Sequence, residues 1–222
     1  MSKNAQLDAI RVEKNRQRVL ECAFTLFAEH GIDSMSMPEI AKAVKMDRSS
    51  IYRYFPTKLD LAVAISANMW KQYNTTQYER AEVSMQTAAQ RYEFWLDRFL
   101  DLYRDHRDLL RFNQFFNVYV ANTEAPAEKM EPYTGVIAEL EKQFHDVYEL
   151  GRKDGTLRAD IPEKSMFSVT LHLMLAAVTR YAVGLVYQSG SDPEAELHEL
   201  KNMMMSRFTT QETETENPRG GF

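Results

Sequence analysis

The sequence contains only one cysteine, eight glycines and seven prolines among its 222 residues. A single cysteine, Cys22, excludes an intramolecular disulfide, so packing rather than cross-linking must hold the fold together. Little glycine and proline beside 44% hydrophobic and 27% charged residues is typical of a helix-rich globular protein. This balance excludes a fibrous repeat or a largely disordered chain.

The chain also lacks the hydrophobic runs of targeting and membrane segments. No apolar run of a secretory signal occurs in the first residues, MSKNAQLDAIRVEK, and we expect a cytoplasmic protein. The most apolar stretch, 167–186, is interrupted by Ser168, His172 and Arg180, whereas a spanning helix needs about 20 mostly apolar residues. We therefore predict a buried or interfacial helix and no membrane partner.

Positive charge is scarce, since the net charge is -5. The imbalance is uneven: residues 1–60 carry five Lys and five Arg against four Asp and four Glu, a net charge of +2, which leaves -7 for residues 61–222. Nucleic-acid phosphates require local positive charge. Any nucleic-acid surface is therefore expected near the N-terminus.

Signatures of catalysis and metal binding are absent from the sequence. It has no glycine-rich phosphate loop and no nucleophile elbow, and its five histidines show no metal-ligand spacing, so we expect no enzyme, no metal and no cofactor. Cys22 falls within a predicted helix. We interpret it as a packing residue, with a redox sensor as the alternative.

Apolar residues at helical spacing fill most of the chain. They predict helices over residues 10–30, 37–44, 48–54, 58–78, 87–103, 107–120, 133–152, 162–188 and 194–208. Two prolines, Pro126 and Pro132, predict a loop or broken helix over 122–132. No alternating strand pattern occurs, so the fold class is all-α with about nine helices.

Three helix starts lie close together. Ser36 and Glu39 have the spacing of a capping box, Asp47 can cap the next helix, and Thr57 with Asp60 can begin a longer one. The two short helices between these starts must turn sharply. A long helix followed by two short ones is typical of the trihelical helix-turn-helix reader of DNA.

The second short helix has two unlike faces. Ile51 and Phe55 can pack on the helix before it, whereas Ser49, Tyr52 and Arg53 face outward. Short hydroxyl residues allow close approach to DNA, and tyrosine and arginine can bind phosphates and base edges. The sequence therefore predicts that this helix reads DNA.

The residues Ile40-Ala41, Ile51-Tyr52-x-Tyr54-Phe55-Pro56-Thr57-Lys58 and Leu61 resemble the signature of TetR-family transcriptional regulators, over about residues 12–61. A weaker resemblance at 150–160 corresponds to the connection before the last two, dimer-forming helices. With this resemblance we expect a DNA-binding domain over 1–56, a helical ligand-binding and dimerisation domain over 57–208, and a disordered tail over 209–222.

The resemblance implies a homodimeric repressor that binds an inverted-repeat operator in double-stranded DNA and is released by a small-molecule effector. The expected DNA-contacting residues are Ser36, Lys45, Arg48, Ser49, Ser50, Tyr52, Arg53, Tyr54 and Lys58. Two positions depart from the family, which usually has glycine at Lys45 and at Ser49. A turn that needs a positive φ costs about 1 kcal/mol with lysine in place of glycine.

The helical domain is expected to hold a largely apolar effector between its helices. Candidate ligand residues are Trp70, Trp95, Phe99, Phe112, Phe116, Tyr119, Met174 and Arg180. Ordinary core packing is the favoured interpretation for each aromatic and methionine taken singly, and a structural partner is favoured for Arg180. The expected dimer interface comprises Phe167, Leu171, Val178, Leu185, Leu197, Leu200, Met204 and Phe208.

Two other functions remain open at this point. The acidic total charge, Lys45 and Ser49 allow a ligand-binding or protein-interaction module whose helix-turn-helix no longer binds DNA. An enzyme is the more distant alternative, because nothing in the sequence anchors a reaction.

Overall fold

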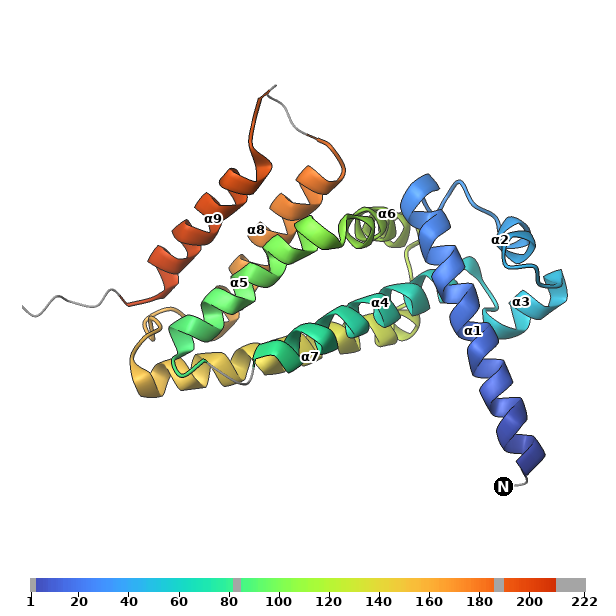
Figure 1. The fold of residues 1–222 in the computed structure, drawn as a ribbon, viewed down its shortest axis with the longest axis horizontal. Helices are drawn as coiled ribbons and strands as arrows, with labels where there is room; N and C mark the ends of the chain where they lie inside the picture. The colour runs from blue at the N-terminus through green and yellow to red at the C-terminus, as the bar shows by residue number, and fades with distance from the viewer. Residues whose placement is uncertain (1–2, 82–84, 186–189, 211–222) are drawn as a thin grey trace, which may run out of the picture.

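The computed structural model describes residues 3–81, 85–185 and 190–210, and within these ranges it contains nine α-helices and no β-strand (Figure 1). The all-α prediction is confirmed. The helices are α1 (Lys3–His30), α2 (Met37–Ala43), α3 (Arg48–Tyr54), α4 (Lys58–Ala81), α5 (Ala88–Asp105), α6 (Arg107–Thr123), α7 (Ala127–Asp154), α8 (Glu163–Ala182) and α9 (Pro193–Phe208).

The helices form a small N-terminal unit and a larger bundle (Figure 1). α1, α2 and α3 pack together at one end of the molecule, and the first turns of α1 project beyond its two short partners. α4 and α7 run side by side along one edge of the bundle, while α5, α8 and α9 form the opposite side. α6 packs on α1 as well as on α8, so it connects the unit to the bundle.

Three helix boundaries differ from prediction. α1 begins at Lys3, well before residue 10, although the side chains of Leu7 and Ile10 are exposed. α7 begins at Ala127 and includes Pro132, so the predicted loop or broken helix over 122–132 is reduced to a break at 124–126. Proline removes one hydrogen bond near the helix start, where the remaining turns hold the helix. α8 ends at Ala182, before Gly184 at φ 78°. Residues 186–188 lie outside the described residues.

The predicted disordered tail begins too early. Leu157 and Thr209 form an isolated antiparallel bridge, the Thr210 amide donates to the Thr156 carbonyl over 3.0 Å, and the Thr210 hydroxyl donates to the Gly155 carbonyl over 2.8 Å. Such hydrogen bonds do not depend on the spacing of apolar residues, so the hydrophobic periodicity of the sequence could not predict them. The rest of the predicted tail, 211–222, lies outside the described residues.

Polar contacts inside the bundle fix the position of α5 against the last two helices. The buried hydroxyls of Tyr92 and Thr170 lie 2.7 Å apart and join α5 to α8. The Lys201 ammonium on α9 lies 2.6 Å from Asp97 and 2.9 Å from Glu93, both on α5. α9 is therefore bound into its own chain by an ion-pair network as well as by apolar packing.

The expected dimer interface is wrong at five of its eight positions. Phe167, Val178, Leu197, Met204 and Phe208 are buried within one chain, so they retain almost no surface for a partner. Periodicity marks an apolar face without telling an intrachain core from an interface. Leu185 is exposed and Leu171 and Leu200 are half-buried. The exposed apolar side chains at the outer faces of α8 and α9 are Val169, Leu173 and Met203.

Within the described part of the chain, no helix is long and apolar enough to cross a membrane.

Gly151 of α7 packs closely against Leu157 in the turn that follows, so a larger residue at position 151 should lower the stability of the protein. A Cβ added at Gly151 would lie 2.7 Å from the Leu157 Cβ, so Gly151→Ala is expected to lower the free energy of unfolding by about 1–3 kcal/mol. The control is Gly135→Ala in the same helix, where no atom lies within 4 Å of the added Cβ. There the gain in helix propensity should raise stability by up to about 1 kcal/mol. Chemical denaturation measures both; equal effects would contradict the packing.

Candidate functional site

The local chemistry of α2 positions the helix that follows it. Ser36 and Glu39 form the predicted capping box: the Ser36 hydroxyl accepts from the Glu39 amide, and the Ser36 amide donates to the Glu39 carboxylate over 2.8 Å. The Ser36 hydroxyl also donates to the Glu39 carboxylate, and this bond, together with the one from the Ser36 amide, lowers the pKa of the Glu39 carboxyl. At the other end, the Met46 amide donates to the Ala41 carbonyl over 2.9 Å and closes the turn into α3.

The start of α3 differs in one respect from prediction. Asp47 occupies the N-cap position, yet its side chain makes no capping hydrogen bond, so the expected role of this carboxylate is wrong. The Thr57 and Asp60 prediction is confirmed, because the Thr57 amide donates to Asp60 over 2.9 Å and the Asp60 amide donates to the Thr57 hydroxyl over 3.1 Å. α4 therefore begins immediately after α3 with its direction fixed.

The two faces of α3 are divided as predicted. Ile51 and Phe55 are buried against Ile40 and the rest of the three-helix core. Tyr52 is 40% exposed, and the side chains beside it on the outer face, Arg48, Ser49 and Arg53, are exposed as well. The Arg53 guanidinium donates to the half-buried Ser50 hydroxyl over 3.2 Å. The structure thus presents this polar face to the outside.

A basic groove lies between α1 and α3, and only part of it was predicted. It is lined by five cationic residues, Arg11, Arg18, Lys42, Lys45 and Arg53, and by two carboxylates, Asp8 and Asp47. The sequence prediction included Lys45 and Arg53 and missed the other three cations. The net positive charge of residues 1–60 was the feature of the sequence that could have indicated these three residues. Tyr54, which is half-buried, also lines this groove.

Lys58 is engaged inside the protein. Its ammonium donates to the Ile32 carbonyl over 2.8 Å and to the Met35 carbonyl over 3.2 Å, and it lies 5.3 Å from the centroid of the Tyr119 ring. These contacts fasten the turn after α1 to the start of α4. A phosphate contact by Lys58 would have to replace some of them.

The turn between α2 and α3 has the predicted strain, since Lys45 has φ 53°. Glycine adopts this region without steric cost, so Lys45→Gly is expected to raise the free energy of unfolding by about 1 kcal/mol. Lys45→Ala, which keeps the Cβ and removes the same charge, is the control and should change stability little. Urea denaturation compares the two variants, and a gain with alanine equal to that with glycine would argue against backbone strain.

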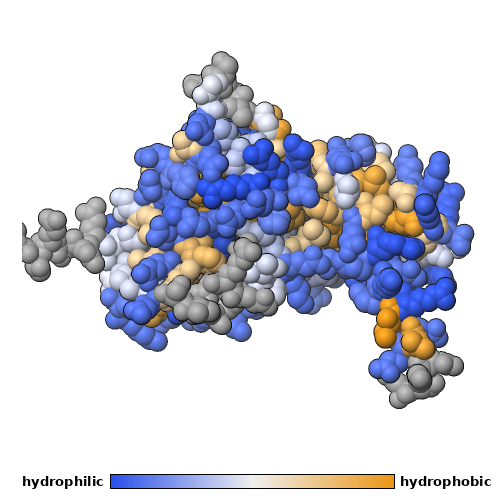
Figure 2. Space-filling view, in the orientation of Figure 1, coloured by the Kyte–Doolittle hydropathy of each residue, from blue (hydrophilic) through white to orange (hydrophobic). Residues whose placement is uncertain are grey.

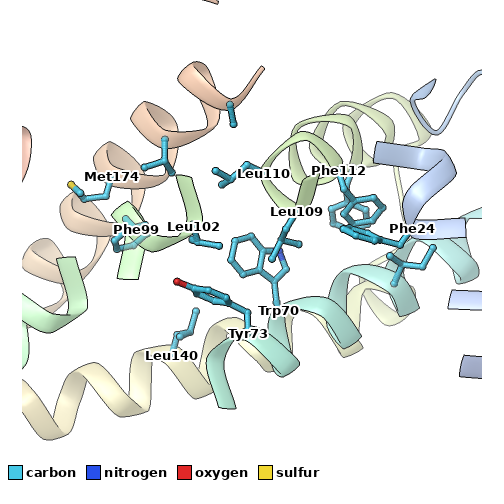
Figure 3. Packing of buried hydrophobic residues seen from close by; sticks show 14 of the residues in the cluster. Phe24, Trp70, Tyr73, Phe99, Leu102, Leu109, Leu110, Phe112, Leu140 and Met174 are labelled. Carbon is cyan, nitrogen blue, oxygen red and sulfur yellow. The ribbon is translucent and has the colours of Figure 1, made fainter. Parts of the chain in front are cut away.

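A cavity of about 340 Å³ lies inside the bundle, within the size range of small-molecule sites. Side chains from five helices, α4 to α8, line it. Three predicted ligand residues, Trp70, Trp95 and Phe99, are among them. Figure 3 shows Trp70 and Tyr73 on α4 directed toward Phe99 and Leu102 on α5, with Leu140 of α7 beside them.

The other predicted ligand residues lie elsewhere, which corrects the expected pocket. Phe112, Phe116, Tyr119 and Met174 are buried but do not line the cavity. Phe112 instead meets Phe24 of α1 at a centroid distance of 5.5 Å, in a separate cluster visible in Figure 3. Arg180 borders a shallower depression over α6 and α8. Core and cavity aromatics share one periodicity, so sequence could not separate them.

The sequence prediction missed the polar residues of the cavity. Arg98 is only 6% exposed; its Nη2 donates to the Asn74 side-chain oxygen over 2.7 Å, while its Nε has no hydrogen-bond partner. Burial lowers the pKa of Arg98 and raises the pKa of the neighbouring Tyr73 hydroxyl, which donates to the Arg98 carbonyl. Asn113 is 2% exposed, and its side-chain oxygen also lacks a partner.

Metal binding and a reactive thiol both find little support in the described ranges. They hold no group of three or more His, Cys, Asp or Glu side chains arranged to bind a metal. Cys22 is half-buried, and burial raises the pKa of its thiol, which disfavours the reactive thiolate.

Comparison with known proteins places the N-terminal unit in one family. Residues 19–65 match the family described as bacterial regulatory proteins of the tetR family. A helix-turn-helix transcriptional repressor from Streptomyces coelicolor is 24% identical over 77% of this chain and 79% of its own length. A helix-turn-helix transcriptional regulator from Staphylococcus aureus is 33% identical over 45% of this chain and 53%, about half, of its own length.

Solved structures share the whole fold. A transcriptional regulator from Saccharomonospora viridis, in complex with choline, is 17% identical with a TM-score of 0.72 and covers 90% of this chain and 100% of its own. The fatty acid degradation regulator of Bacillus halodurans is 15% identical with a TM-score of 0.69, over 86% of this chain and 94% of its own. At these identities the likeness is one of fold.

Proposed function

We propose that this chain, a TetR-family regulator with the family's DNA-binding helix-turn-helix, is a repressor released from a palindromic operator by a small-molecule ligand. The observation that carries the proposal is the exposed polar face of α3 beside a basic groove. We assign DNA binding to residues 1–56 and regulation and dimerisation to 57–208. Its place of action is then the cytoplasm, where bacterial DNA lies.

Residues of α3 divide between base and phosphate contacts in this proposal. Arg48, Ser49 and Tyr52 read base edges, because these side chains are polar and exposed on the outer face of α3. The exposed Ser36 at the start of α2 and the half-buried Ser50 of α3 are assigned to the same contact. Arg53, Lys45 and Tyr54 bind phosphates together with the groove residues Arg11, Arg18 and Lys42. The negative charge of residues 61–222 keeps the rest of the surface from competing for DNA.

A homodimer supplies two copies of this face, as an inverted repeat requires. We propose that the partner covers the exposed apolar side chains of α8 and α9, namely Val169, Leu173 and Met203, together with Leu185. Sedimentation tests this surface. Leu173→Glu should produce monomers, whereas a glutamate at Leu7, an equally exposed residue on the projecting part of α1, should leave the dimer intact.

The cavity is coupled to the reader through two helices. α4 begins directly after α3 and carries Trp70 and Tyr73 into the cavity wall. α6 carries the cavity residue Asn113 and, one residue earlier, Phe112, which packs on α1. A ligand that moves either helix changes the spacing of the two readers, and typical couplings of this kind amount to about 1–3 kcal/mol. The structural neighbour that holds choline supports a small-molecule role.

Gel shifts against fragments of the source genome, with excess nonspecific competitor DNA, test the proposal. We expect retention of a few fragments that contain inverted repeats, and release by a small molecule that occupies the cavity. Binding of no fragment would favour the second candidate, a ligand-binding or protein-interaction module without DNA binding. The positive φ of Lys45 keeps that candidate open, because it strains the turn that orients α3.

A further inference from the structure

The cavity of the bundle carries a buried positive charge that the fold itself does not neutralise. Arg98 contributes the guanidinium, and its neighbours are the neutral amide of Asn74 and the aromatic rings of Trp95 and Tyr73, whose centroids lie 5.6 Å and 5.8 Å from it. In the described part of the chain, no carboxylate forms an ion pair with Arg98. Ring faces and an amide oxygen stabilise a cation without cancelling its charge.

The other charged groups of the cavity wall do not offset this positive charge. The wall's two residues that can carry charge are Arg98 and His172, and its described lining includes no Asp or Glu. The other lining residues are apolar or aromatic, apart from Asn74, Asn113 and Asn117. An isolated buried cation is energetically unfavourable unless a counter-charge reaches it.

One hydrogen-bond donor of this lining residue has no partner in the protein. The Nε of Arg98 is buried and without a partner, whereas Nη2 donates to Asn74 over 2.7 Å. Asn74 therefore holds one end of the guanidinium and leaves the Nε donor unsatisfied. The partnerless side-chain oxygen of Asn113 is an acceptor in the same wall.

We propose that the effector is an organic monoanion, an apolar body that carries one carboxylate, and that Arg98 is the residue that binds this carboxylate. The inference rests on the proposed ligand-regulated function and specifies its ligand class. Charge-assisted hydrogen bonds of this kind discriminate strongly, because the neutral analogue leaves the buried donor unpaired. The aromatic wall made by Trp70, Trp95 and Phe99 contacts the apolar body.

The route into the cavity is consistent with a ligand of this shape. The depression over α6 and α8 shares Asn113, Asn117, His172 and Leu175 with the cavity, so the two spaces adjoin. Arg180 borders this depression.

The test uses the full chain and three probes with the same alkyl body: decanoate, decanol and decylamine. Isothermal titration should show that decanoate binds at least about tenfold more tightly than either other probe. Arg98→Gln should abolish this preference while decanol still binds, and Arg98→Lys should retain part of it. Arg91→Gln, which removes an exposed arginine from the same helix, is the matched control and should behave as wild type.

Equal binding of decanoate and decanol to the wild-type chain, preferred binding of decylamine, or binding of none of the probes would overturn the inference without any variant having to fold. Circular dichroism and the thermal midpoint confirm the fold of each variant. Operator release is measured separately by gel shift. Arg98-dependent decanoate binding that leaves DNA bound would contradict the proposed ligand regulation and not the ligand class, whereas release by a cation alone would contradict only the ligand class.

Discussion

Replacing Phe112 by alanine is expected to lower the free energy of unfolding by about 3–5 kcal/mol. Its ring is fully buried and lies 5.5 Å from Phe24 of α1 and 5.9 Å from Phe116, centroid to centroid, so truncation leaves a cavity that the rigid helices cannot close. This loss is a large share of the about 5–15 kcal/mol that typically stabilises a folded protein. Urea denaturation at one fixed protein concentration measures it, because the stability of the proposed dimer depends on concentration.

The matched control for this prediction is Phe115→Ala. Phe115 is the same residue type on the same helix, but it is 38% exposed, and its truncation should cost less than about 1 kcal/mol. Phe112 also joins the N-terminal unit to the bundle. A loss for Phe112→Ala no larger than the small loss expected for Phe115→Ala would mean that the packing of Phe112 between α1 and α6 contributes little to stability.

Substitutions on α3 should separate base reading from phosphate binding. Tyr52→Ala is expected to weaken operator binding by about 1–3 kcal/mol and to relax base preference, because its exposed side chain reads base edges in the proposed complex. Arg53→Gln should weaken binding to all sequences and reduce the slope of log affinity against log salt by about one, because one phosphate contact is lost. Fluorescence anisotropy over a series of salt concentrations measures both effects.

Lys164→Gln is the control for charge. It removes one exposed cation at the start of α8, in the regulatory bundle, and should leave the affinity and the salt slope unchanged. A similar reduction in slope for Lys164 and Arg53 would show that the charge of the whole protein, and not the α3 face, governs DNA binding. Figure 2 shows hydrophobic surface at the projecting end of α1, the part of the chain in which Leu7 and Ile10 are exposed.

Local features were the most predictable from sequence, because the residues that cause them lie within one turn of each other. The Ser36 and Glu39 capping box and the Thr57 and Asp60 pair follow from spacing alone, whereas the positive φ of Lys45 was expected from the glycine that the resembled family usually has there. The Asp47 cap did not form, since an N-cap position does not by itself bring a carboxylate onto the free amides.

Features that depend on how helices face one another could not be predicted. Residues of a buried core, a cavity wall and a dimer surface all repeat with the same helical period, so the sequence does not distinguish them. It therefore predicts Phe112 as a ligand contact and Val178 as a dimer contact, although both are buried in the core. One feature of the sequence could have identified Arg98 as a buried residue of the bundle. This arginine lies three residues after Trp95 and four before Leu102, which places a cation on the apolar face of α5.

The central claim is that α3 reads a two-fold symmetric DNA sequence. Selection of bound duplexes from a random pool, followed by sequencing, tests it most directly. The account predicts an inverted repeat whose half-site centres lie about 10 base pairs, or a small multiple of that, apart, and loss of this enrichment in Tyr52→Ala. Recovery of no enriched sequence by the wild-type dimer, or of one without two-fold symmetry, would contradict it.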